Sequence, residues 1–190
     1  VRDCTFINTD IGLRFKSARG RGGVVEKIYI ERINMLDIDK AAISISLFYE
    51  QKQRPKQDEV PPVTEETPAI RDIHFKEVVC RGAERAVVLD GLPEMPLSNI
   101  TMEKVSISAQ EGFFCSEVVD SSFKQVEFFP QRGPVMTLVN TGNVTIEVGA
   151  YPEDQRLLRI EGKRSQGIRL FGPAGTELRE ELEIGAEVPA

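Results

Sequence analysis

The sequence of 190 residues predicts an all-β solenoid, in which parallel strands stack along one axis. The first observation behind this fold class is a repeated pattern of three apolar residues, separated by two residues and then by one. The second is that most copies lie twenty to thirty residues apart, as successive turns of a solenoid do. The third is that no segment combines a sustained 3.6-residue apolar period with helix-capping residues.

The copies of the pattern follow one another along most of the chain. They are Val1-Cys4-Phe6, Val25-Ile28-Ile30, Ile70-Ile73-Phe75, Leu97-Ile100-Met102 and Phe123-Val126-Phe128, with a weaker copy at Thr141-Val144-Ile146. A second short strand follows most copies, and we expect these strands at 12–15, 42–47, 86–89, 112–115 and 135–139. One turn cannot bury its apolar face alone, so stacked turns should align like residues into a continuous core. Parallel strands would then pair from turn to turn.

The spacing of the copies also predicts the domain organisation. They start at residues 1, 25, 70, 97, 123 and 141, so the steps are 24, 45, 27, 26 and 18. The long step contains 50–67, a segment rich in Gln, Lys, Glu and Pro that we interpret as an inserted loop. We expect residues 1–150 to form the coils.

Residues 151–190 should complete the same domain with terminal strands and a C-terminal cap. We expect strands at 157–160 and 167–171 and a turn at 172–175. A short helix or a polar edge strand at 177–183 would then cover the last unpaired strand.

Composition excludes several classes of partner. The net charge is −6 and the pI about 5.0, which argues against nucleic acid because nucleic-acid binding requires a basic surface. No apolar run approaches the roughly 20 residues of a membrane span, so no membrane partner is expected. Cys4, Cys80 and Cys115 lack metal-ligand spacing, which favours buried free thiols over a disulfide framework.

The strongest candidate site residues lie in the stretch 12–17. Arg14 and Lys16 alternate with Leu13 and Phe15, so a strand here would hold two cations side by side on its outer face. Such a pair can bind an anion, since guanidinium grips a carboxylate through two bonds and ammonium adds a charge. The strand pattern alone favours the plainer interpretation, in which the two basic residues lie on an exposed strand and bind no ligand. Tyr49, after the 42–47 strand, could donate a hydrogen bond into a groove or form an aromatic shelf.

Other reactive side chains show no catalytic pattern. His74 should point outward and has no neighbours that suggest a triad. Asp10, Asp37 and Asp39 form no acid/base pair on a shared strand face. The run 20–23 contains three glycines, but it lacks phosphate-loop spacing and precedes a strand, so we interpret it as a tight turn between coils.

Several segments, taken in order, resemble glycoside hydrolase family 28, the polygalacturonases and their relatives. Segment 12–17 is similar to the family's Gly-x-Arg-Ile-Lys-Thr motif, with Phe15 for Ile and Ser17 for Thr. Segment 22–28 resembles the glycine-rich turn and strand that follow this motif, and 42–49 resembles the strand ending in the family's active-site tyrosine. Segments 68–73 and 91–96 are similar to later coils of bacterial members.

The resemblance implies a right-handed parallel β-helix of the pectin-lyase-like kind, of which this chain would be the C-terminal coils. It also implies hydrolysis, with inversion and without metal or other cofactor, of α-1,4-galacturonosyl links in a pectic oligo- or polysaccharide. Arg14 and Lys16 would bind a galacturonate carboxylate, and Tyr49 would line the same groove. The resemblance also implies that the protein is secreted or periplasmic.

The chain departs from the family's catalytic motifs. It has no Asp-Asp pair and no Gly-His-Gly, and Asn8-Thr9-Asp10 mimics the family's Asn-x-Asp by letters only. An inverting hydrolase needs two carboxyl groups, so we expect no catalytic residue in this chain and no activity of the chain alone. We also expect its open end to contact missing N-terminal coils or to self-associate. The alternatives are a non-catalytic solenoid module that binds acidic polysaccharide and a polysaccharide lyase, although no carboxylate cluster is apparent that would hold a lyase's calcium.

Overall fold

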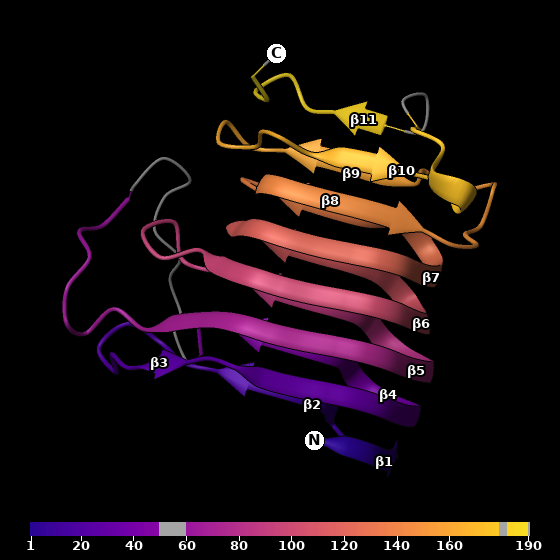
Figure 1. Cartoon of the computed structure of the whole chain (residues 1–190), viewed down its shortest axis with the longest axis horizontal. Coiled ribbons are helices and arrows are strands. Elements are labelled where there is room, and N and C mark those ends of the chain that lie inside the picture. Colours follow the sequence, from indigo (N-terminus) through magenta and orange to yellow (C-terminus); the bar gives the residue numbers. More distant parts are fainter. Residues whose placement is uncertain (50–59, 179–181, 190) are drawn as a thin grey trace.

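A computed structural model, which describes residues 1–49, 60–178 and 182–189, confirms the predicted all-β solenoid of parallel strands. The strands rise in chain order from β1 to β11 (Figure 1). They are β1 (Arg2–Ile7), β2 (Ile11–Lys16), β3 (Val24–Val25), β4 (Ile28–Ser46), β5 (Ala69–Asp90), β6 (Leu97–Ser116), β7 (Val118–Val139), β8 (Gly142–Val148), β9 (Leu158–Glu161), β10 (Arg169–Phe171) and β11 (Leu182–Ile184). Within the described residues, the one helical element is the short η1 (Pro173–Gly175).

The strands β4 to β7 each run through most of a coil and bend on the way. We predicted two short strands per coil, but the pairing continues through the bends into a further segment, such as Val78–Arg81 of β5 against β6. At one bend Asp72, Asn99, Asp120 and Asn143 stack with positive φ angles of 50–54°. Asn and Asp tolerate this left-handed conformation better than most residues. The Asn99 amide also donates to the Asp72 carboxylate at 2.6 Å.

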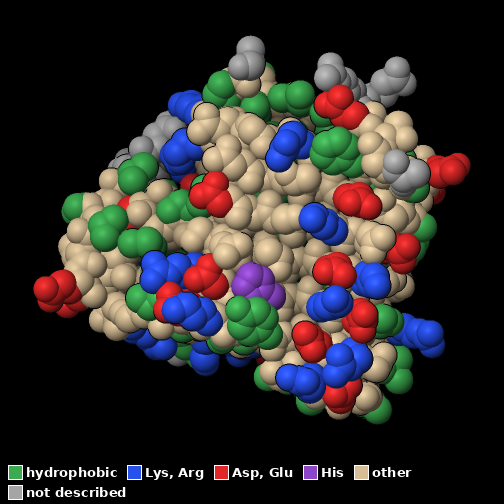
Figure 2. Space-filling view, viewed as in Figure 1, with side chains coloured by type: hydrophobic (Ala, Val, Ile, Leu, Met, Phe, Trp, Pro, Cys, Tyr) green, Lys and Arg blue, Asp and Glu red, His purple; other side chains and the backbone are tan. Residues whose placement is uncertain are grey.

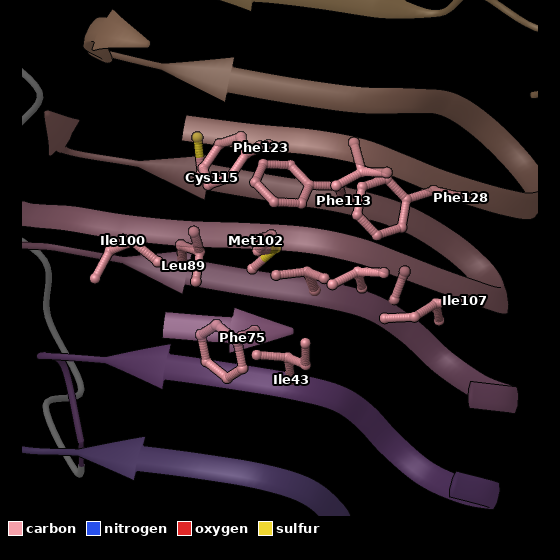
Figure 3. Packing of buried hydrophobic residues seen from close by; sticks show 14 of the residues in the cluster. Ile43, Phe75, Leu89, Ile100, Met102, Ile107, Phe113, Cys115, Phe123 and Phe128 are labelled. Carbon is pink, nitrogen blue, oxygen red and sulfur yellow. The ribbon is translucent and has the colours of Figure 1, made fainter. Parts of the chain in front are cut away.

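The repeated apolar residues form the interior, as the pattern predicted. Phe75, Met102, Phe123 and Ile146 lie in register on successive strands, and each is at most 1% exposed. Phe113 lies beside them, with its ring centroid 5.1 Å from that of Phe123 and 5.4 Å from that of Phe128 (Figure 3). Burial of such side chains is the main force that holds the coils together.

The C-terminal part continues the stack. Strands β9 and β10 occupy the two segments where strands were expected, and β11 pairs with β9 in parallel. The segment expected to be a helix or an edge strand lies in part outside the described residues, as does most of the expected inserted loop. Residues 182 and 183 of the former belong to β11 and are extended.

One outer face of the stack carries the single histidine. The His74 ring stacks on Tyr29 at 4.8 Å between centroids, and its Nδ1 shares a 2.8 Å hydrogen bond with the Thr101 hydroxyl. Acidic and basic side chains mingle beside the histidine on this face (Figure 2), and one such pair is Lys76 with Glu103 at 3.3 Å. Since stacking and cross-strand pairing occupy these side chains, we assign this face to the scaffold.

Candidate functional site

Strand β2 positions the two candidate cations on a different outer face of the stack. Its side chains alternate, so Leu13 is 8% exposed in the core while Arg14 and Lys16 are both exposed to solvent. Arg14 lies in register with Ser44 of β4, and Lys16 with Ser46. We call the outward side of this part of the sheet, formed by β2 and the ends of β4, β5, β6 and β7, the site face.

Tyr49 lies next to both cations. The chain leaves β4 and doubles back, so that Phe48 bridges Ala18 in antiparallel fashion and the Tyr49 N–H donates to the Ser17 carbonyl at 3.1 Å. This turn places the Lys16 Nζ 3.8 Å from the centroid of the Tyr49 ring and the Arg14 Cζ 5.3 Å from it. The structure thus brings together the three residues that we singled out in the sequence.

A fourth residue, Arg21, joins this cluster and was missed in the sequence. Its Cζ lies 5.3 Å from the Tyr49 centroid. The tight turn that we expected at 20–23 lies slightly earlier, at 18–21, where the Arg21 N–H donates to the Ala18 carbonyl at 3.2 Å. The N–H groups of Gly20 and Gly22 both donate to the Glu66 carbonyl at 3.0 Å. Gly22 has a φ of 56°, and a Cβ there would collide with a backbone carbonyl. The signal in the sequence was an arginine inside the glycine-rich run that follows Lys16.

Arg14 and Lys16 differ from many arginines of the chain in their ionic contacts. Many arginines pair with described carboxylates, namely Arg19, Arg32, Arg71, Arg85, Arg132, Arg159 and Arg164. Within the described part of the chain, neither Arg14 nor Lys16 forms an ion pair. Cation–π contact with Tyr49 holds them close together, and two adjacent positive charges favour the binding of an anion.

A buried ion pair supports the two connections that carry Arg21 and Tyr49. The Arg19 guanidinium binds the Glu94 carboxylate through two bonds, Nε to Oε1 at 2.5 Å and a terminal nitrogen to Oε2 at 2.8 Å. The Glu94 side chain is 2% exposed, and Arg19 lies over the Phe48 ring at 5.5 Å. We call this pair the Arg19–Glu94 clamp. Because Phe48 precedes Tyr49 directly, the clamp fixes the backbone that presents the aromatic ring.

The carboxylates considered in the sequence do not enter the cluster. Asp10 forms a surface ion pair with Lys40 at 2.7 Å. Asp37 and Asp39 line a separate depression along another edge of the stack. Asp90 lies on the site face in register with Ser46, but it is 3% exposed and has other interactions. Across residues 1–49, 60–178 and 182–189, no group of His, Cys, Asp and Glu could hold a metal ion. Because none of these carboxylates pairs with Arg14 or Lys16, the two cations can bind an anion from solution.

Comparisons with known proteins give one family match and one distant relative. The model of the family described as glycosyl hydrolases family 28 matches residues 1–125, which include the whole cationic cluster. A protein of Vitis vinifera, described as a probable polygalacturonase, is 29% identical over 146 residues. The match covers 72% of this chain and 28% of that relative, so the chain spans under a third of its length. No solved structure matches the chain significantly. In the described part of the chain, no helix has the length and apolar character needed to span a bilayer.

Proposed function

Because the chain belongs to glycosyl hydrolase family 28, we propose that its site face binds galacturonate units of a pectic polysaccharide. The observation that carries this proposal is the pair of exposed cations, Arg14 and Lys16, that share one tyrosine ring and pair with no described carboxylate. A galacturonate unit is a pyranose ring that bears one carboxylate and several hydroxyl groups. The cluster offers cations that can bind the carboxylate and a phenol that can hydrogen-bond to the hydroxyl groups.

Each residue has a distinct role in this proposal. The Arg14 guanidinium donates two parallel N–H bonds to the two carboxylate oxygens, and Lys16 supplies a point charge to the same group. The Tyr49 ring holds both cations near each other, and its hydroxyl donates to a sugar oxygen. Arg21 borders the same ring, with its Cζ 5.3 Å from the Tyr49 centroid.

We assign recognition to this chain and bond cleavage to groups elsewhere in the protein. Inverting hydrolysis uses one carboxylic acid to protonate the leaving oxygen and a second carboxylate to activate water. Among the described residues of the site face, the carboxylate in register with Lys16 is that of Asp90, which is only 3% exposed and has other interactions. The chain alone should therefore bind pectic saccharide without hydrolysing it. Since such saccharides lie in plant cell walls, we propose an extracellular or periplasmic location.

Binding of oligogalacturonate by calorimetry tests the recognition role. We expect Arg14→Ala and Lys16→Ala each to weaken binding by roughly 10- to 100-fold, the range for loss of hydrogen bonds to a charged group. Arg71→Ala is the matched control, because Arg71 is an exposed arginine paired with Glu26 outside the cluster, and it should bind like the wild type. Equal affinity of all three variants, or equal affinity for a neutral galactose oligomer, would contradict the proposal.

The division between recognition and cleavage has its own test. Incubation of the chain with polygalacturonate should release no new reducing ends, while the natural protein that contains it should release them. Robust turnover by the 190-residue chain would overturn our assignment. Binding without turnover by the natural protein as well would favour a non-catalytic module, and an unsaturated product would favour a lyase.

A further inference from the structure

A depression lies on the site face, three strands away from Arg14. Arg14 is in register with Ser44 of β4, Ser44 with Val88 of β5, and Val88 with Phe114 of β6. Residues in register point to the same side of a sheet, so Phe114 belongs to the same outer column as Arg14. Adjacent strands lie about 4.8 Å apart, which puts the two positions roughly 14 Å from each other.

This depression combines a flat apolar surface with two arginines. It has a volume of about 500 Å³, and its lining includes Arg85, Glu111, Phe114, Arg132, Pro134 and Thr137. We call it the Phe114 depression. The Phe114 side chain is half-buried, so one part of its ring faces the space. Gly112 at the same place has no side chain to fill it, and a Cβ there would collide with the Val135 carbonyl.

The charges of the Phe114 depression do not cancel. Arg85 and Arg132 share one carboxylate, that of Glu111, at 3.0 Å each. The two arginine side chains are 50% and 63% exposed. A guanidinium has five N–H donors, so each arginine keeps donors for a further acceptor. Arg85, Arg132 and Glu111 together carry a net positive charge, so the Phe114 depression favours an anionic ligand.

We propose that the Phe114 depression is a second uronate-binding subsite, which holds a more distant unit of the same pectic chain that Arg14 and Lys16 bind. The inference rests on the proposed function of the site face. A pyranose ring presents a face of C–H groups that can pack on Phe114, while its carboxylate accepts hydrogen bonds from Arg132 and Arg85. Continuity of the site face and complementary charge both favour the polysaccharide as the occupant.

The proposal predicts that affinity depends on chain length in a specific way. A short oligomer held at Arg14 cannot span roughly 14 Å to reach Phe114. A longer oligomer can occupy both subsites, and its second contact is intramolecular, so affinity should rise steeply once the chain is long enough. Each step in length before that point should add little.

The test compares di- and hexagalacturonate by calorimetry on the full 190-residue chain. Phe114→Ala and Arg132→Gln should each weaken hexamer binding by roughly tenfold and leave dimer binding unchanged. Arg132→Gln changes an exposed side chain, so it keeps the test valid if Phe114→Ala disturbs folding. Arg71→Gln is the matched control, since it also removes an exposed, ion-paired arginine, and it should bind both oligomers like the wild type.

The outcomes separate failure of this inference from failure of the proposed function. If Arg14→Ala weakens both oligomers and the two Phe114-depression variants weaken neither, the second subsite is wrong and the proposed function stands. If the Arg132→Gln loss is equal for dimer and hexamer, the depression is not a distant subsite. If the wild type binds neither oligomer, both proposals fail together.

Discussion

Replacing Glu94 by Gln would test whether the Arg19–Glu94 clamp stabilises the fold and the site. The substitution keeps the shape of the side chain but removes its charge and one of the two bonds to Arg19. Removing one partner of a buried ion pair costs about 3–5 kcal/mol. The Arg19 side chain is 23% exposed, so water screens part of the loss, and we expect about 2 kcal/mol. For a chain of this size, roughly 2–4 °C of melting temperature corresponds to each kcal/mol, which gives a decrease of roughly 4–8 °C.

Thermal unfolding followed by circular dichroism measures this decrease. The matched control is Glu103→Gln, because Glu103 pairs with Lys76 at 3.3 Å while both side chains are about half exposed. That substitution should cost less than about 1 kcal/mol. Oligogalacturonate binding should also weaken in Glu94→Gln, because the clamp supports the turn that presents Tyr49. Equal melting temperatures of the two variants would refute the reasoning about the clamp.

Two further predictions concern the core. At pH 8 an aromatic disulfide reagent should label the half-buried Cys4 in the folded protein, whereas Cys80 and Cys115 should react only after denaturant is added. Burial raises the pKa of Cys80 to about 11 and that of Cys115 to about 12, so both stay protonated and unreactive. Rapid labelling of three thiols in the folded state would show that this packing is wrong. Phe113→Ala should lower the free energy of unfolding by about 3–5 kcal/mol in denaturant titration, because it leaves a cavity between two aromatic rings, whereas Tyr29→Ala, at a side chain 58% exposed, should cost less than about 1.5 kcal/mol. Similar costs for the two substitutions would contradict the packing.

The apolar repeat predicted the solenoid because each coil must bury the same positions. Ile73 and Phe75 are at most 1% exposed, and their counterparts in other coils align with them across the sheet. The bends were not predictable in the same way. Asp72 and Asn99 adopt left-handed backbone at positions outside the core, where there is no apolar signal in the sequence. The hydrogen bond between their side chains depends on the stacking itself. Two short strands were therefore expected where the ladder continues through the bend.

Prediction of the site depended on how far apart its members lie in the chain. Arg14 and Lys16 could be found because both occupy one strand and alternate with apolar residues. Arg21 could not, since its position beside Tyr49 arises from a glycine turn and from the bridge between Ala18 and Phe48. Such contacts between connecting segments follow from the way coils stack, which no local pattern encodes.

The same stacking explains why the site combines strand and loop residues. Arg14 and Lys16 are held by the regular ladder between β2 and β4, whereas Tyr49 comes from the connection after β4. Connections of a solenoid are its least constrained parts, because neighbouring coils pair through their strands. The Arg19–Glu94 clamp joins the connection after β2 to the one after β5, and Arg19 also covers Phe48 in the connection after β4. Three successive connections are thereby fixed to one another, so a loop residue can be held as firmly beside Lys16 as a strand residue would be.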